Sequence, residues 1–265
     1  MTKITVQDIL NRKQKEKKKI TVLTAYDFPT AKLVDEAGMD IVLVGDSLGM
    51  VLLGYDSTLP VNMEDMLHHL KAVSRAVKHA FLVVDMPYRS YETPEQSLKN
   101  ARRFLKEGGA EAVKLEGGKK ILEQVKALVK AEIPVMGHLG MTPQSATELG
   151  GYKVQGKTRE QAEQIFNDAL MLEKAGAFSI VLECVPRLLA KKISQAVHIP
   201  TIGIGAGPET DGQVLVLHDL LGFESQVKPR FVRRYADLNQ EIKRALREYR
   251  DDIINGRFPS EKESF

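Results

Sequence analysis

Strand-length apolar runs alternate with helical patterns along this sequence, and that alternation limits the possible folds more than any other feature. The run "VLVGDSLG" at 42–49 is typical, because a buried strand ends there on a carboxylate between glycines. Eight strands are predicted, at 20–25, 40–45, 80–85, 111–116, 133–138, 178–183, 200–204 and 213–217. Strands separated by helices predict a parallel sheet.

Eight such units in 265 residues favour a closed (β/α)8 barrel, the TIM barrel, over an open sheet, because this barrel typically takes about 250 residues. The segments "EAGMDIVLVGD", "EGGAEAVKLEG" and "KAGAFSIVLEC" form a weak internal repeat of glycine, apolar strand and carboxylate. No linker divides the chain. We therefore predict a single barrel domain over 1–265, with a short N-terminal helix and a C-terminal helical extension.

Capping signals mark several helix starts. Asn62, Thr93 and Thr158 each precede a helical pattern, and Thr5 is expected to cap a short helix before the first strand. These residues supply side-chain oxygens that accept hydrogen bonds from the first backbone N–H groups of a helix. The sequence therefore predicts four helix starts with a physical reason for each.

The last predicted helix, around 231–253, has one apolar face. Apolar residues recur along it at three- and four-residue spacing: Phe231, Tyr235, Leu238, Ile242, Leu246, Tyr249 and Ile253. The tail "GRFPSEKESF" adds Phe258 and Phe265. Because an apolar stripe of this kind needs a partner that covers it, we expect a homo-oligomer.

Composition excludes several classes of protein. Hydrophobic residues make up 43% and charged residues 28%, as in ordinary globular proteins. A net charge of +3 gives no basis for nucleic-acid binding. No apolar run approaches the ~20 residues that span a bilayer, so no membrane partner is expected. The N-terminus lacks the pattern of a secretory signal, and a cytoplasmic location is expected.

Four carboxylates end predicted strands at matching offsets: Asp46, Asp85, Glu116 and Glu183. Because catalysis in this architecture lies at the carboxyl ends of the strands, these acids are predicted to converge. Ionised carboxylates repel one another unless a cation lies between them. Without Cys or paired His nearby, Asp46, Asp85 and Glu116 favour Mg²⁺, although Mn²⁺ or Co²⁺ could substitute. The competing interpretation is that such acids cap helices or pair with lysines.

Lys114 and Glu183 carry two further hypotheses. Lys114 stands two residues before Glu116 on one predicted strand, so both side chains point to the same face. A buried lysine needs an anionic partner, and a substrate carboxylate beside the metal would serve. Schiff-base chemistry is less favoured, because neighbouring acids hold the amine charged. Glu183 lies in an apolar setting that suits a general base, and Ser47 can add a hydroxyl hydrogen bond near the metal.

Other features keep two interpretations each. His138 either contacts substrate or is satisfied by backbone groups. Cys184 is favoured as a small buried hydrophobe over a nucleophile, because no activating base stands nearby in the sequence. The segment "IGIGAG" at 202–207 departs from the dinucleotide-binding spacing, and its ligand stays open. The basic run at 12–19 is either an anion site or, as favoured, solvated surface.

Several blocks of the sequence resemble the ketopantoate hydroxymethyltransferase family. They are "GDSLGMVLLGYDSTLPV", "VVDMPYRSY", "AVKLEGG", "PVMGHLGMTPQS", "VLECVP" and "IGIGAGPETDGQVLVLHDLLG", and the resemblance spans roughly residues 5 to 250. It implies that a one-carbon unit passes from 5,10-methylenetetrahydrofolate to 3-methyl-2-oxobutanoate. The product would be 2-dehydropantoate, in the biosynthesis of pantothenate.

The resemblance also implies roles for the site residues. Asp46, Asp85 and Glu116 match the metal positions of a Mg²⁺-dependent barrel of the phosphoenolpyruvate/pyruvate type. The keto-acid contacts are matched by Asp46, Ser47, Asp85 and Lys114. Glu183 matches the proton acceptor. A cytoplasmic homo-oligomer, commonly a decamer, is implied as well.

Two rival functions stay open at this point. Another Mg²⁺-dependent aldolase or lyase that acts on a 2-keto acid would use the same enolate chemistry without folate. The other rival is a non-catalytic barrel that acts as a binding or assembly protein, and the full acid set argues against such a loss of activity. A requirement for methylenetetrahydrofolate in a turnover assay separates the three functions.

Overall fold

A computed structural model describes residues 2–146, 151, 153–223 and 229–265. The chain divides into two compact units, Met1–Val216 and Leu217–Phe265. One barrel domain over 1–265 with a helical extension therefore stays a prediction. Over the described ranges, none of the helices has the length and apolar character that would let it cross a membrane.

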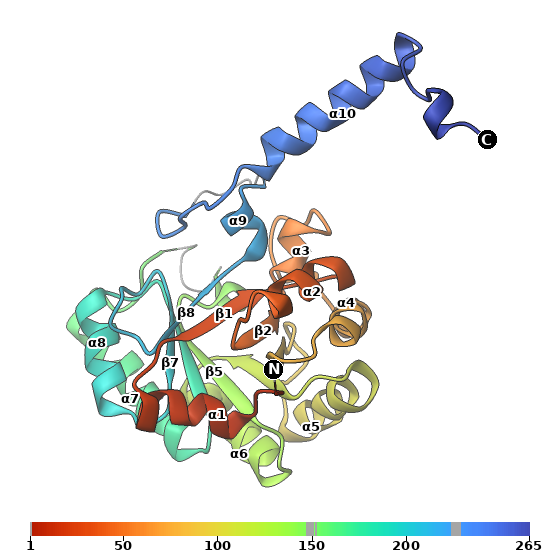
Figure 1. The fold of residues 1–265 in the computed structure, drawn as a ribbon. Helices are drawn as coiled ribbons and strands as arrows, with labels where there is room; N and C mark the ends of the chain where they lie inside the picture. Colours follow the sequence, from red (N-terminus) through yellow and green to blue (C-terminus); the bar gives the residue numbers. More distant parts are fainter. Residues whose placement is uncertain (1, 147–150, 152, 224–228) are drawn as a thin grey trace. The chain divides into compact units, whose positions relative to one another are not determined.

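Eight parallel strands close into a barrel in the first unit (Figure 1). They are β1 (Ile20–Thr24), β2 (Ile41–Val44), β3 (Phe81–Asp85), β4 (Ala112–Glu116), β5 (Val135–Gly140), β6 (Ser179–Glu183), β7 (Thr201–Ile204) and β8 (Gly212–Leu215). Each strand pairs with the next in sequence, and β8 pairs with β1. Every predicted strand is present with its ends within two residues of the expected positions, and the predicted fold class is confirmed.

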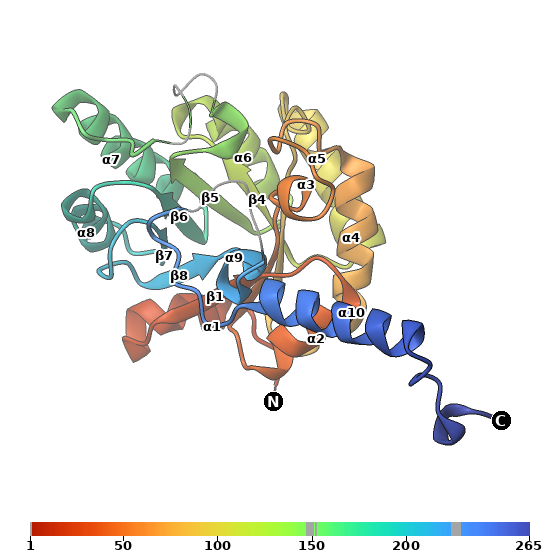
Figure 2. The ribbon, with the colours of Figure 1, turned by 90° about the horizontal axis from the view of Figure 1, so that it is seen from above.

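Helices surround the strands on the outside of the barrel (Figures 1 and 2). They are α1 (Val6–Asn11), α2 (Phe28–Glu36), α3 (Leu48–Val51), α4 (Met63–Ala76), α5 (Pro94–Arg103), α6 (Leu122–Lys130), α7 (Arg159–Lys174) and α8 (Arg187–Ala196). Short π or 3₁₀ segments add η1 (Arg12–Glu16), η2 (Phe104–Gly108), η3 (Lys119–Ile121) and η4 (Pro143–Ser145). The helix α4 buries Met66, Leu70 and Val73 along one face, as an amphipathic helix on a barrel must.

The predicted capping residues begin their helices. Asn62 caps α4 and accepts hydrogen bonds from two backbone N–H groups at 2.8 and 3.1 Å. Thr93, Thr158 and Thr5 cap α5, α7 and α1 through bonds of the same kind. Each side chain satisfies donors that the first turn of a helix leaves without intrahelical partners, so the four signals are confirmed.

The segment before β1 packs at the end of the barrel where the strands begin. Ile9 of α1 is fully buried. Arg12 pairs with Asp40, just before β2, at 2.7 Å, and Lys13 pairs with Asp211, just before β8, at 2.9 Å. Part of the basic run at 12–19 therefore holds the fold together, which neither the anion-site nor the solvated-surface interpretation predicted.

No helix stands between β7 and β8, whereas the alternating pattern predicts one; all residues of this connection, 205–211, are described. They are too few for a helical crossover, which takes at least about 10 residues. Gly205 and Gly207 have φ values of 64° and 85°, in the left-handed region that glycine adopts without strain. The glycines of "IGIGAG" therefore allow the tight backbone of this short connection. Whether the segment binds a ligand stays open.

The second unit contains α9 (Leu217–Leu221), α10 (Leu238–Ile254) and the 3₁₀ segment η5 (Glu261–Glu263). The predicted start of the last helix near 231 is wrong, because α10 begins at Leu238. Asp237 precedes it and accepts a hydrogen bond from the Gln240 N–H at 3.3 Å. A capping carboxylate fixes a helix start, whereas the apolar spacing continued upstream through Phe231 and Tyr235 without one.

Asp35, near the end of α2, fixes the chain just before β3. Its carboxylate is 3% exposed and accepts from the N–H groups of Lys78, His79 and Ala80 at 2.9, 3.0 and 2.7 Å. Burial alone would raise the pKa of Asp35, but these donors outweigh burial and lower it below the ordinary value of 3.8. A lowered folded-state pKa means that Asp35 stabilises the fold above its unfolded pKa. That stability is lost as the pH falls through the folded-state pKa.

We expect Asp35→Ala to lower the free energy of unfolding by about 3 kcal/mol near neutral pH, because three backbone N–H groups, one buried and two part-buried, lose their acceptor. The loss relative to the wild type should shrink below about pH 4. Urea unfolding of both proteins from neutral to acid pH measures this difference. Glu36→Ala, at an exposed neighbouring position, is the control. A loss that is the same at every pH would contradict the role given to the ionised carboxylate.

Candidate active site

The carboxyl ends of five neighbouring strands bring the predicted site residues together. They are Asp46 and Ser47 after β2, Asp85 at the end of β3, Lys114 and Glu116 on β4, His138 on β5 and Glu183 at the end of β6. Strand register places Asp85 beside Lys114, and Glu116 beside His138. These four side chains and Asp46 are at most 6% exposed. The predicted convergence of the acids is thus present at one end of the barrel.

Lys114 is the cation at the centre of this cluster. Its Nζ lies 2.9 Å from Asp85 Oδ1, 3.9 Å from Glu116 Oε1 and 3.1 Å from His138 Nδ1, which accepts a hydrogen bond from it only when the ring is neutral. Burial would lower the pKa of Lys114, but the charges of the surrounding acids outweigh burial and raise it. Lys114 therefore stays an ammonium group. This agrees with the expected shared face of Lys114 and Glu116 and argues against a Schiff base.

The three acids differ in their electrostatic surroundings. Burial and the charges of Asp85 and Glu116 raise the pKa of Asp46 well above its ordinary value. Burial also raises the pKa of Asp85, although Lys114 opposes the shift. Burial opposes the ionisation of Glu116 too, but His138 and Lys114 outweigh it and lower its pKa. One ammonium group does not balance three close carboxylates, so further positive charge would stabilise the ionised cluster.

His138 connects the acid cluster to Glu183. Its Nε2 lies 3.2 Å from Glu183 Oε2, and its Nδ1 lies 3.4 Å from Glu116 Oε1. Burial and the Lys114 ammonium lower the pKa of His138, but the two carboxylates outweigh them and raise it to about 9. The hydrogen bond from Lys114 needs the neutral ring with its proton on Nε2, and added positive charge would favour that form. The ring contacts side chains, so it is not satisfied by backbone groups alone.

Two buried carboxylate oxygens of the cluster accept no hydrogen bond, namely Asp85 Oδ1 and Glu116 Oε1. Both face the Lys114 ammonium at ion-pair distances. Within the described ranges, no three His, Cys, Asp or Glu side chains are arranged around a common point as metal ligands. The donor set nevertheless fits a hard cation, because carboxylate oxygens without hydrogen bonds are the ligands that Mg²⁺ prefers.

Gln144 and Tyr91 belong to the cluster, and the sequence analysis missed both. Gln144 donates from Nε2 to Asp46 Oδ2 at 2.9 Å and from its backbone N–H to Glu116 Oε2 at 3.0 Å. The Tyr91 hydroxyl donates to Gln144 Oε1 at 2.6 Å. Both residues stand in the blocks "PVMGHLGMTPQS" and "VVDMPYRSY". A search for charged groups passes over them, because an amide does not titrate and a phenol titrates far above neutrality.

Ser47 reaches the site through a tight turn after β2. Its Oγ forms a hydrogen bond with the Tyr26 hydroxyl at 2.8 Å, and the adjacent Asp46 N–H donates to Asp85 Oδ2 at 3.1 Å. A Cβ atom at Gly45 would lie 2.9 Å from Ser47 Oγ and 3.5 Å from Asp85 Oδ2. A side chain at this position in "VGDS" would therefore require Ser47 Oγ to move from its present place.

Cys184 has the environment of a structural thiol. It is half-buried, and burial together with the neighbouring Glu183 charge raises the pKa of Cys184 to about 11. A thiol with a raised pKa holds little of the thiolate that a nucleophile needs. The favoured structural interpretation agrees with this environment, although the side chain is less buried than predicted.

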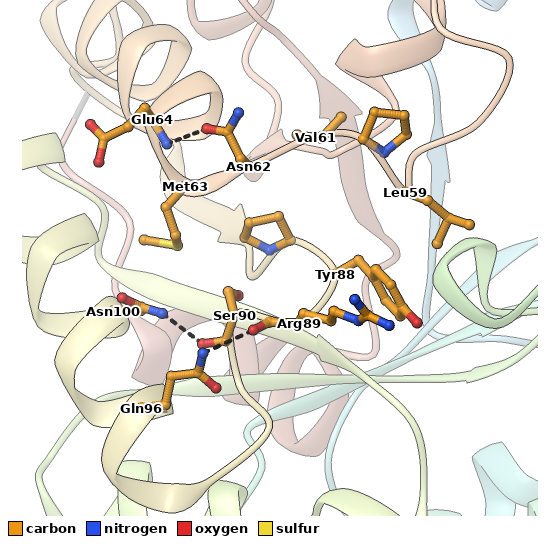
Figure 3. A pocket seen from close by; sticks show the side chains of 12 residues that line it. Leu59, Val61, Asn62, Met63, Glu64, Tyr88, Arg89, Ser90, Gln96 and Asn100 are labelled. Atoms are coloured by element: carbon orange, nitrogen blue, oxygen red, sulfur yellow. Dashed lines mark hydrogen bonds between the residues drawn. The ribbon is translucent and has the colours of Figure 1, made fainter.

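A groove of about 500 Å³ lies beside the loop that follows β3 (Figure 3). The segment before α4 forms one wall, and residues 87–90 form the other. Gln96 and Asn100 of α5 hold that loop through hydrogen bonds to its carbonyls at 2.9 and 2.7 Å. The loop begins at Met86, whose carbonyl accepts a hydrogen bond from Gln144, so one short segment contacts both the groove and the acid cluster.

The fold and the buried cluster define the class, which is a (β/α)8-barrel enzyme with an acidic site at the carboxyl ends of its strands. The sequence model of ketopantoate hydroxymethyltransferase matches residues 3–261. The chain belongs to the ketopantoate hydroxymethyltransferase family, as the resemblance of its sequence blocks predicted.

Relatives from several bacteria match nearly the whole chain. The 3-methyl-2-oxobutanoate hydroxymethyltransferase of a Thermoanaerobacter species is 58% identical over 257 residues, covering 97% of this chain and 94% of the relative. The enzyme of the same name from Carboxydothermus hydrogenoformans is 56% identical and covers 100% of this chain and 96% of the relative. The one from Thermus thermophilus is 53% identical and covers 98% of this chain and 99% of the relative.

Solved structures of other enzymes share the barrel. A phosphonopyruvate hydrolase in complex with oxalate and Mg²⁺ matches with a TM-score of 0.63 and 14% identity, over 98% of this chain and 93% of that one. A 2,3-dimethylmalate lyase of the PEP mutase/isocitrate lyase superfamily matches with a TM-score of 0.62 and 14% identity, over 98% and 90%. At this identity the similarity shows the fold alone, a (β/α)8 barrel, and the phosphoenolpyruvate/pyruvate type stays a prediction.

Proposed function

We propose that this chain transfers a hydroxymethyl unit from 5,10-methylenetetrahydrofolate to 3-methyl-2-oxobutanoate, forming 2-dehydropantoate in pantothenate biosynthesis. The observation that carries the proposal is the buried cluster of three acids and Lys114, with His138 linking it to Glu183. A 2-keto acid needs positive charge beside its oxygens and a base near its C3 proton. Lys114, together with a cation held by the three acids, would offer the first, and Glu183 would offer the second.

Asp46, Asp85 and Glu116 would hold a divalent cation, and we propose Mg²⁺. Asp85 Oδ1 and Glu116 Oε1, which accept no hydrogen bond, support this, and so does the Mg²⁺ bound in the phosphonopyruvate hydrolase of similar fold. When bound, the cation would act as a Lewis acid toward the oxygens of the keto acid and stabilise the charge that develops at C3 deprotonation.

The chain's own residues would bind and orient the keto acid. We assign this role to Asp46, Ser47, Asp85 and Lys114, which line the same end of the barrel. Lys114 carries the buried positive charge that a substrate carboxylate requires. Because water is excluded from the cluster, each charged contact there is stronger than it would be at the surface.

Glu183 would accept the C3 proton. Its side chain is 13% exposed, so it lies at the opening of the buried cluster, where a bound substrate can reach it. His138 holds one of its oxygens at 3.2 Å and leaves the other for the substrate. The carbanion formed at C3 then attacks the one-carbon unit, and water supplies the oxygen of the new hydroxyl group. The bonds from the unit to the two folate nitrogens break, and tetrahydrofolate leaves with the C3 proton and one proton of water on those nitrogens.

Removal of one carboxylate charge should weaken Mg²⁺ binding, so that a higher Mg²⁺ concentration is needed for activity. We expect Asp85→Asn and Glu116→Gln each to raise the Mg²⁺ concentration for half-maximal activity by at least about 10-fold, with partial rescue at high Mg²⁺. Titration of activity with Mg²⁺ measures this change. If both variants kept the metal requirement of the wild type, the assignment of these acids would be wrong.

The proposed reaction is tested with purified protein, 3-methyl-2-oxobutanoate and methylenetetrahydrofolate, with and without Mg²⁺. Formation of 2-dehydropantoate that needs both folate and Mg²⁺ is the expected result. Turnover of a 2-keto acid without folate would instead identify an aldolase or lyase, as the 2,3-dimethylmalate lyase of similar fold is. Binding of the keto acid without any turnover would identify a non-catalytic barrel.

We propose a homo-oligomer located in the cytoplasm, a decamer if the family resemblance extends to assembly. The apolar stripe of α10 supports an oligomer, because Ile242, Leu246, Tyr249 and Ile253 are 42–63% exposed. Light scattering at micromolar concentration should give a mass several times that of one chain. A mass of 29.5 kDa, that of a single chain, would contradict this prediction.

A further inference from the structure

Gln144 joins two of the three acids. It lies in η4 after β5 and is 6% exposed. Its Nε2 donates to Asp46 Oδ2 and to the Met86 carbonyl, both at 2.9 Å, while its backbone N–H donates to Glu116 Oε2 at 3.0 Å. One residue therefore contacts the ends of β2, β3 and β4 through two separate groups, the side-chain amide and the backbone.

Tyr91, Asp46 and Met86 together fix which way the amide of Gln144 points. Burial, and then the charge of Glu116, raise the pKa of Tyr91, so the phenol keeps its proton and donates it to Gln144 Oε1 at 2.6 Å. In the opposite orientation, Oε1 would face Asp46 Oδ2 and the Met86 carbonyl, which are both acceptors. Only the observed orientation satisfies all of these groups.

Asp46 depends on this donor more than an exposed carboxylate would. It is 3% exposed, and within the described ranges the amide of Gln144 is the side-chain donor that forms a hydrogen bond with its carboxylate. The amide of Gln144 donates to Oδ2 and thereby leaves Oδ1 for another ligand. Because the Met86 carbonyl accepts the second amide hydrogen, both donors of the Gln144 amide are bonded in the observed orientation.

We propose that Gln144 is a positioning residue for the cation site, with its amide, oriented by Tyr91, holding Asp46 in place. The inference rests on the proposed function, since it takes Asp46 and Glu116 to be cation ligands. A side-chain substitution at Gln144 would release Asp46 but keep the backbone bond to Glu116. A Gln144 substitution should therefore weaken cation binding while all the proposed ligands and the base Glu183 are still present.

Binding of Mn²⁺ to the metal-free protein, followed by electron paramagnetic resonance, tests this role without turnover. Gln144→Leu should weaken Mn²⁺ binding by about 10- to 100-fold, the usual effect of removing a group that orients a metal ligand. Tyr91→Phe keeps the amide and loses only the bond that orients it, so about 2- to 10-fold is expected. If Gln144→Leu fails to fold, Tyr91→Phe still decides the question.

Gln124→Leu is the matched control. Gln124 is 8% exposed and donates to the carbonyls of Tyr91 and Glu92, both at 3.2 Å, so it supports the same loop as Gln144 does. Its hydrogen bonds go to backbone carbonyls and to no acid of the cluster. Its loss should lower the melting temperature and leave Mn²⁺ affinity unchanged, which separates support of the loop from positioning of Asp46.

Exchange of the C3 hydrogen of 3-methyl-2-oxobutanoate with D₂O gives the second measurement. In Gln144→Leu, exchange should approach the wild-type rate at saturating Mn²⁺, with a raised half-saturating concentration. Unchanged Mn²⁺ affinity, or slow exchange with the metal fully bound, would overturn the positioning role while leaving the proposed function intact. A wild type that neither binds Mn²⁺ nor exchanges the hydrogen would overturn the proposed function, and this inference with it.

Discussion

Glu183→Gln is expected to lower turnover by about 10²- to 10⁴-fold, the contribution of a positioned base, while Mg²⁺ and the keto acid still bind. The variant keeps the size and polarity of the side chain and loses its negative charge. Its amide can still contact the His138 ring, whose Nε2 lies 3.2 Å from Glu183 Oε2 in the wild type, so the local packing is retained. The three acids of the cluster are unchanged, and cation binding should persist.

The proton step can be followed alone, by NMR exchange of the substrate's C3 hydrogen in D₂O with Mg²⁺ and without folate. The wild type should exchange this hydrogen and Glu183→Gln should not. His138→Gln, compared under the same conditions, shows which of the two contacting groups takes the proton. Normal exchange in Glu183→Gln with none in His138→Gln would transfer the role of base to the imidazole, and Glu183 would become a residue that orients it.

Much of the fold follows from local sequence signals. Each strand is an apolar run that a barrel buries, and caps such as Asn62 and Thr158 satisfy the first donors of their helices, so both features can be recognised without tertiary information. The absence of a helix between β7 and β8 was not predicted, because the alternating pattern suggests a helix where the connection is too short for one. The start of α10 was misplaced for a related reason, since apolar spacing alone does not mark where a helix begins.

The acids of the site could be predicted because strand ends in a barrel meet at one face, so a carboxylate after an apolar run has a known destination. The same reasoning placed Lys114 with Glu116, two residues apart on β4. Gln144 and Tyr91 could not be found in this way. Their importance lies in hydrogen bonds across the barrel to Asp46 and to each other, and such partners become known only from the three-dimensional arrangement.

Lys114 should matter for stability as well as for binding. Lys114→Met keeps much of the apolar stem but removes the ammonium group that lies between Asp85 and Glu116, both of which are buried. Loss of one partner leaves buried charges without compensation, which costs about 3–5 kcal/mol in measured cases. We therefore expect Lys114→Met to lower the free energy of unfolding by about this amount in the presence of EDTA.

Two conditions should reduce that loss. Mg²⁺ supplies positive charge to the same acids, so it should raise the melting temperature of Lys114→Met more than that of the wild type. Without Lys114 the folded-state pKa values of the acids rise further, so the folded variant takes up protons. Its deficit should then be smallest in mild acid and grow as the pH rises toward neutrality.

Thermal and urea unfolding in EDTA and in Mg²⁺, at several pH values, measure these effects. Lys126→Met is the control, because Lys126 and Glu123 form an exposed pair at 2.8 Å, and such pairs contribute at most about 1 kcal/mol. If Lys114→Met were as stable as the wild type in EDTA, the ammonium group would not be what compensates the acids. If Mg²⁺ gave the variant no additional stability, those acids would not form a cation site, because a bound cation and Lys114 must act on the same negative charge.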